Sequence, residues 1–422
     1  MQIVPTSLVR ITRYYMIAAV FYLLITLATG IIRALTPLPS PLVHWAPSVL
    51  AWVSFPIMGA YYQFFPTLQG RDLRWERLTL PQFVLANVGV LGLIGAALLG
   101  NQPSLVVGST IFTAAALLFA AIIVFANLDT TKITLTLRFY LASLAYFVIA
   151  VILFFLKSLG ISPIWASTAF LLHLFATGWA ILAIMGAEYA MVPMLQLKEL
   201  RYPRLADAQF YLANLGIGGL AIAMAIGNGP LIAAAGSLTL IAILVFVYNI
   251  IASLTYGPSR MAHLDISVKY FLVGIVYLLV TALVGILVAA FRWWSVVPIH
   301  LHLGLIGVVT LTIVGGTYHI VPFVVWWEVY APKLGYEDVP MVKQLYNERS
   351  ANWQLYGFNA GLILMIGGFA LSANYLLAAG GTILVLAALA YAREMINVVG
   401  HRKNLAKPAT QKAAEKAVGG KV

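Results

Sequence analysis

Histidines are the residues in this chain whose types and spacing point most clearly to chemistry, and four of the seven share one pattern. His44 and His300 each lie fifteen residues before a glycine, and His173 and His302 each lie thirteen residues before one. In each segment a proline follows that glycine seven residues later, and the three segments recur about 128 residues apart. Histidine inside an apolar segment costs free energy unless it is paired or ligated. The pattern is typical of a helical scaffold that builds a metal or haem site between its repeats.

The composition identifies the elements that must position these histidines. Hydrophobic residues make up 62% of the 422 residues and charged residues only 9%, which excludes a soluble protein. The apolar segments are too long for barrel strands, so we expect an all-α integral membrane protein in which helices satisfy the backbone. The sequence predicts twelve transmembrane helices, at about residues 12–35, 43–68, 80–99, 105–127, 134–158, 164–196, 208–227, 230–255, 268–291, 297–326, 352–372 and 375–398.

The net charge of +12 is best explained by topology rather than by a nucleic-acid partner. If both termini are cytoplasmic, Arg33, Lys157 and Arg292 are the only outer residues among 25 lysines and arginines. This asymmetry follows the positive-inside rule. We therefore expect a multi-pass protein of the bacterial or archaeal cytoplasmic membrane, with residues 401–422 forming a basic cytosolic tail.

A threefold repeat organises residues 1–400 as a single transmembrane domain. Its units cover about residues 10–130, 131–258 and 259–400, and each is expected to form one of three pseudo-symmetric arcs of four helices. The first helix of each unit opens on a basic residue and two aromatics, and the third carries a Gln–Asn–Gly pattern. We expect the asparagines of that pattern, Asn87, Asn214 and Asn359, to bond neighbouring backbone.

The histidine pair of helix ten predicts two different sites. His300 and His302 are two residues apart, so their side chains point about 200° apart around the helix. His302 facing His44 would sandwich one haem iron between two imidazoles, a closed arrangement that suits electron transfer. His300 would ligate a second haem on one side only, leaving the other side for a diatomic gas.

Twelve helices in three arcs, with His44 on helix two and His300-Leu301-His302 on helix ten, resemble subunit I of the haem–copper oxidase superfamily, including its nitric oxide reductase branch. The resemblance implies that His44 and His302 hold a low-spin haem b and that His300 holds a high-spin haem. It also implies that His173, on helix six, binds a second metal, either copper or non-haem iron. Helix seven departs from the family because it lacks the two adjacent histidines that complete the metal site there, so catalytic residues stay unassigned.

Other residues extend this hypothesis. Arg33 and Arg292 are candidate partners for haem propionates. Glu188 lies fifteen residues from His173, about 22 Å along a helix, too far to complete the same metal site. The absence of cysteine excludes thiolate ligands and c-type haem attachment, so a soluble cytochrome c-type donor or a partner subunit would be another chain; quinol is the other expected donor.

Three functions remain open at this point. The first is a haem-binding membrane redox protein that passes electrons to, or binds, O₂ or NO. The second is a haem or gas sensor, or an assembly factor, with the same fold and no turnover. The third is a twelve-helix transporter, which a parallel threefold repeat with few buried charges fits less well.

Overall fold

The computed structural model describes residues 6–161, 163, 165–258 and 261–404. Apart from one isolated bridge between Leu334 and Glu337, these residues form no strand, and long helices dominate them. Most of the predicted basic tail, from residue 405 on, lies outside the described residues.

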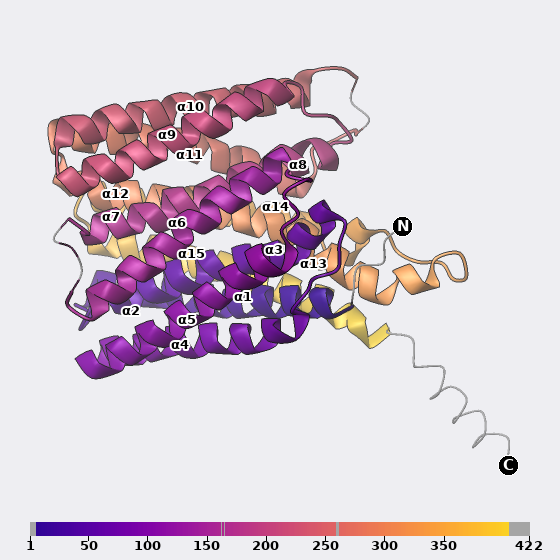
Figure 1. Cartoon of the computed structure of the whole chain (residues 1–422), viewed down its shortest axis with the longest axis horizontal. Coiled ribbons are helices and arrows are strands. Elements are labelled where there is room, and N and C mark those ends of the chain that lie inside the picture. The colour runs from indigo at the N-terminus through magenta and orange to yellow at the C-terminus, as the bar shows by residue number, and fades with distance from the viewer. Residues whose placement is uncertain (1–5, 162, 164, 259–260, 405–422) are drawn as a thin grey trace, which may run out of the picture.

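The helices run along one common axis (Figure 1). Observed helix ends fall within about six residues of the predicted ones. The helices are α1 (Thr6–Leu35), α2 (Leu42–Trp45), α3 (Ser54–Gln69), α4 (Thr79–Leu99), α5 (Gln102–Asn127), α6 (Leu135–Ser158), α7 (Thr168–His173), α8 (Leu182–Leu195), α9 (Pro203–Ile226), α10 (Gly229–Thr255), α11 (Ile266–Phe291), α12 (Val297–His302), α13 (Leu311–Val329), α14 (Glu348–Ala370) and α15 (Asn374–Gly400).

Three of the twelve predicted spans are each divided by a π-helical segment of eight residues. These segments are Ala46–Val53 between α2 and α3, Leu174–Ile181 between α7 and α8, and Leu303–Thr310 between α12 and α13. Each begins one or two residues after a histidine of the repeat. π-helical turns are rare and often mark functional sites because they reposition side chains around the helix.

Glycines give each four-helix unit the same close contacts. A Cβ on Gly59, Gly186 or Gly315 would lie 2.5–2.8 Å from the Cβ of an aromatic residue on the preceding helix. Those aromatics are Tyr15, Phe139 and Tyr270. Small residues let membrane helices approach closely. The resulting van der Waals packing drives helix association in lipid, where no hydrophobic force acts between helices. The repeated motif therefore fixes the distance between the first and second helices of each unit.

Half-buried polar side chains repeat in the same way. Asn87, Asn214 and Asn359 each donate an amide hydrogen bond to the carbonyl four residues earlier, at 2.7–2.8 Å. The predicted structural role of these asparagines is confirmed.

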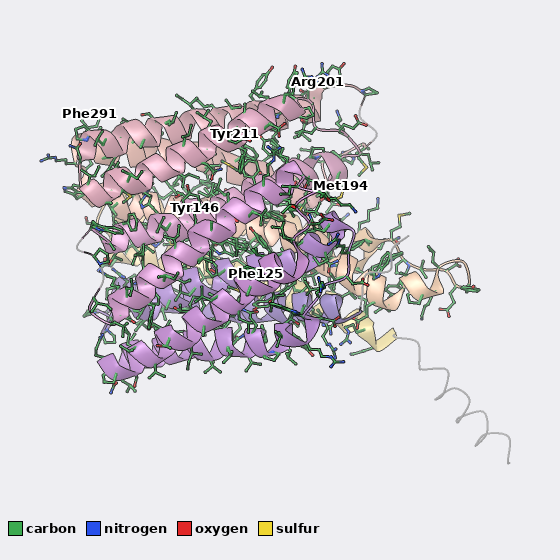
Figure 2. The ribbon with its side chains drawn as sticks, viewed as in Figure 1. Phe125, Tyr146, Met194, Arg201, Tyr211 and Phe291 are labelled. Carbon is green, nitrogen blue, oxygen red and sulfur yellow. The ribbon has the colours of Figure 1, made fainter. Side chains whose placement is uncertain are left out.

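The outer surface of the bundle is compatible with lipid. Among the described residues, eleven helical segments are long and apolar enough to cross a bilayer. The remaining long helix, α14, starts with polar residues such as Glu348 and Arg349. Large apolar side chains such as Phe125 and Phe291 project outward, 78% and 62% exposed (Figure 2). The chain is thus an all-helical, multi-pass membrane protein.

Candidate haem site

The four repeat histidines lie at one end of the bundle. Figure 1 shows α2, α7 and α12 together at the end opposite the loop that joins α13 to α14. His44, His173, His300 and His302 occupy these three short helices or their last residues and are all half-buried. Their common depth is the arrangement that ligands of one cofactor layer require.

Two of the histidines are oriented by their own helices. The Nδ1 atom of His173 donates to the carbonyl of Ala169 at 2.8 Å, and Nδ1 of His302 donates to the carbonyl of Pro298 at 2.7 Å. A carbonyl oxygen can only accept, so Nδ1 carries the hydrogen and Nε2 keeps its lone pair. Histidines that bind metals are usually held in this way, with the second nitrogen hydrogen-bonded to a backbone oxygen.

The other two histidines are oriented by the preceding helix. His300 Nδ1 donates to the carbonyl of Thr281 on α11 at 3.1 Å. His44 Nδ1 lies 3.1 Å from the hydroxyl of Thr29 on α1. That hydroxyl points its hydrogen at the carbonyls of Ile25 and Thr26, each 2.9 Å away, so it accepts from His44. Nε2 is therefore the free ligand atom on these two rings as well.

Glycines on the preceding helices make room for these two rings. A Cβ on Gly285 would lie 2.7 Å from His300 Cε1, and a Cβ on Gly30 would lie 3.2 Å from His44 Cε1. A larger side chain at either position would displace the imidazole. His44 and His300 are thus held in the same way, each by a hydrogen bond to the preceding helix and by contact with a glycine of that helix.

The histidines fall into two candidate pairs. His44 and His302 lie on spans that the Trp52–Thr310 hydrogen bond joins, and the charge of Arg33 at the end of α1 acts on both rings. His173 and His300 lie side by side, with ring centroids 5.9 Å apart and ring planes inclined by 21°. The sequence hypothesis assigned His300 to a high-spin haem and His173 to a metal beside that haem, and the structure places these two rings next to each other.

The second pair could have been predicted from the repeat itself. His44 lies fifteen residues before its glycine, and its candidate partner His302 lies thirteen before the glycine of the third unit. The same offsets, applied to the third and second units, bring together His300 and His173. The repeat does not predict the contacts that hold the His44 and His300 rings, because these contacts depend on how α1 and α11 pack. They are made by Thr29, Thr281, Gly30 and Gly285.

Two tryptophans join the histidine helices below the site. Trp52 Nε1 donates to Thr310 Oγ1 at 2.8 Å, and Trp179 Nε1 donates to Ser54 Oγ at 3.1 Å. Both accepting hydroxyls also donate to the carbonyl five residues earlier, within or at the end of a π-helical segment. These bonds hold the three π-helical segments in register with one another.

Two other candidate residues form no hydrogen bond or ion pair with the histidines in the described part of the chain. Arg292 is exposed at the end of α11, where it has a left-handed backbone with φ 56°. Glu188 is 1% exposed, and its Oε2 has no hydrogen-bond partner within the described residues. Within the part of the chain that the structure describes, no three His, Cys, Asp or Glu side chains gather as a metal site. The ligand chemistry at this end of the bundle therefore consists of imidazole pairs.

The sequence is similar to that of one reported bacterial protein. No protein-family profile matches the chain. A protein of Aquifex aeolicus described as uncharacterized is 30% identical over 288 residues, which cover 67% of this chain and 71% of the relative. The similarity spans enough of both chains to show common descent.

Proposed function

We propose that this chain, which belongs to the same family as the Aquifex aeolicus protein, is a haem-binding membrane redox protein. In this proposal His44 and His302 hold a low-spin haem b, and His300 holds a second haem. The three four-helix units form arcs around the site, and both termini face the cytoplasm of a bacterium or archaeon.

The observation that carries the proposal is the orientation of the four imidazoles. Each has Nδ1 hydrogen-bonded to an oxygen, which leaves Nε2 as a lone-pair donor. An unused imidazole nitrogen in the apolar region costs free energy. Four such nitrogens at one depth support ligation, and iron in haem accepts imidazole as an axial ligand.

The residues around the first pair suit a porphyrin better than a bare ion. A bare transition-metal ion usually takes three or more protein ligands, whereas haem iron needs only axial ones. The ring of Phe369 on α14 lies 4.8 Å from that of His302, and Arg33 adds a positive charge for an anionic propionate. Arg292 is the corresponding cation for the second haem. A second metal on His173, copper or non-haem iron, would lack a three-residue ligand group within the described residues.

Helix α12 would connect the two haems. His300 and His302 are separated by a single residue of α12, so the haems they would hold lie at the same depth. When bound, haem supplies the one-electron chemistry, and the chain positions it and excludes water. The expected electron donor is quinol or a cytochrome c-type protein, and a soluble cytochrome or partner subunit would be a separate chain.

A reduced-minus-oxidised absorption spectrum of the purified protein tests this function. We expect haem b bands, with the low-spin signal lost in His44→Ala and in His302→Ala. His319→Ala is the matched control, because His319 lies on α13 about 25 Å from His302 along the helix. A protein without any haem absorption, or a spectrum unchanged by His44→Ala, would refute the proposal.

Turnover separates the redox function from a sensor or an assembly factor. Consumption of O₂ or NO with a reduced donor supports an oxidoreductase, and a haem protein without turnover is the second candidate. Its supporting observation is the position of His173 beside His300, where a gas would otherwise bind.

A further inference from the structure

The two histidine pairs occupy the same place in two contacts between repeat units. In each pair, one histidine lies fifteen residues before its glycine and the other lies thirteen residues before the glycine of the preceding unit, counted cyclically. At the equivalent positions between the second and first units, the repeat places Leu171 and Ala46, whose side chains have no ligand atom. The scaffold therefore has three equivalent positions, and histidines fill two of them.

The tryptophan bonds show the same cyclic relation independently. Trp52 and Trp179 each lie seven residues before their glycines, and Thr310 and Ser54 each lie five before theirs. Trp52 bonds the third unit and Trp179 bonds the first, so each reaches back to the preceding unit. The relation that joins His44 to His302 thus holds throughout the site and applies to His300 and His173.

The seats of the rings match as well. His44 and His300 are both held from the preceding helix and rest against a glycine, whereas His302 and His173 are both held by the carbonyl four residues earlier. Each pair therefore contains one ring of each kind. What is proposed for the first pair has the same structural basis in the second.

The distance between His173 and His300 discriminates between one metal and two. When one ion joins two rings, two metal–nitrogen bonds of about 2 Å, plus about 1 Å from each Nε2 to its ring centre, separate the centres by about 6 Å. A second metal about 3.5–4 Å from the first would raise this separation to about 10 Å. The observed 5.9 Å agrees with one ion.

We propose that His173 and His300 are the two axial ligands of a single haem iron, forming a second bis-histidine site related to the first by the repeat. This inference rests on the proposed haem function. It assigns His173 to the haem of His300 instead of to a separate metal. With two imidazoles each, both irons would be closed to gases, which suits electron transfer better than gas chemistry.

Carbon monoxide binding to the reduced protein tests the assignment. The unmodified protein is expected to bind two haems and to show no carbon monoxide difference spectrum. His173→Ala opens one iron, so carbon monoxide should bind to about half of the haem, and His319→Ala should bind none. Carbon monoxide binding to half of the haem in the unmodified protein, unchanged by His173→Ala, would overturn the assignment.

Electron paramagnetic resonance of the oxidised, unmodified protein gives a readout that does not depend on how the variants fold. All iron is expected to be low-spin, in two populations. A high-spin signal from half of the iron, or a single haem insensitive to His173→Ala, would overturn the assignment while leaving the first haem in place. Protein without haem would instead refute the proposed function itself.

Discussion

At the scale of single residues, the site depends on how each imidazole is held rather than on the histidines alone. Thr29 and Thr281 direct two rings from neighbouring helices, and Gly30 and Gly285 leave the space that those rings occupy. Hydrogen bonds to the second nitrogen of a metal-bound histidine tune both affinity and redox potential. If the proposed haems are bound, Thr29, Gly30 and Gly285 are the positions where a side-chain change would alter one haem without the other.

Thr29→Val should change the first haem while keeping its ligands. Valine removes the acceptor for His44 Nδ1–H, so the imidazole becomes a weaker donor to iron. We expect haem retention to fall by about 10-fold or more and the midpoint potential to rise. A redox titration with optical detection measures both, and Thr29→Ser, which keeps the hydroxyl, should restore the original potential. Equal potentials in all three proteins would contradict the role of this bond.

Gly285→Ala should affect the second haem selectively. The added Cβ would lie 2.7 Å from His300 Cε1, closer than real contacts allow, so the ring must move. We expect loss of about half of the haem, quantified as pyridine haemochrome. Gly30→Ala, at 3.2 Å from His44 Cε1, should have a smaller effect on the other haem, and Gly95→Ala, with no atom within 4 Å, should have none.

At the scale of elements, the three helices that carry the histidines share a design. Each has a short outer helix, a π-helical segment of eight residues, and a long helix containing the repeat glycine. The π-helical segments follow the histidines directly, and the glycines fix the distance to the preceding helix. The packing in the middle of the bundle thus sets the position of the histidines at one end of it.

Two adjacent glycines on α13 allow this packing to be tested. A Cβ on Gly315 would lie 2.5 Å from Tyr270 Cβ, whereas a Cβ on Gly316 would have no neighbour within 4 Å. Gly315→Ala should destabilise the protein by about 1–3 kcal/mol because the helices must separate. Gly316→Ala should be neutral or stabilise by up to about 1 kcal/mol through helix propensity. Thermal unfolding in detergent compares the two variants, and similar melting temperatures would argue against the close contact.

At the scale of the whole molecule, a partly buried ion-pair network joins the two ends of the described chain. Glu328, at the end of α13, accepts from Arg13 on α1 at 2.6 Å and from Arg402 after α15 at 2.8 Å. Arg13 is only 4% exposed and Glu328 only 13%. The first and third units are therefore linked at the end of the bundle opposite the histidines.

Glu328→Gln should destabilise the folded protein by about 3 kcal/mol, because it leaves the buried Arg13 without its countercharge. The control is Glu337→Gln, whose partner Lys333 lies on the exposed loop after α13 and whose own side chain is 61% exposed. An exposed pair contributes less than about 1 kcal/mol. Unfolding by denaturant in mixed micelles measures both variants, and equal losses would show that the network is not effectively buried.

From the sequence alone the extent of the apolar spans and the role of the asparagines can be predicted, because both are set by length, hydropathy and local hydrogen bonding. The π-helical segments that divide three of the spans were not predicted. The sequence also determined the offsets of His44, His173, His300 and His302 from their glycines. Only the tertiary structure decided that His173 lies 5.9 Å from His300, and that Thr29, Thr281, Gly30 and Gly285 seat two of the rings. The reason is physical: a helix's own residues set where its side chains lie along it, but which ring meets which depends on how separate helices pack around one another.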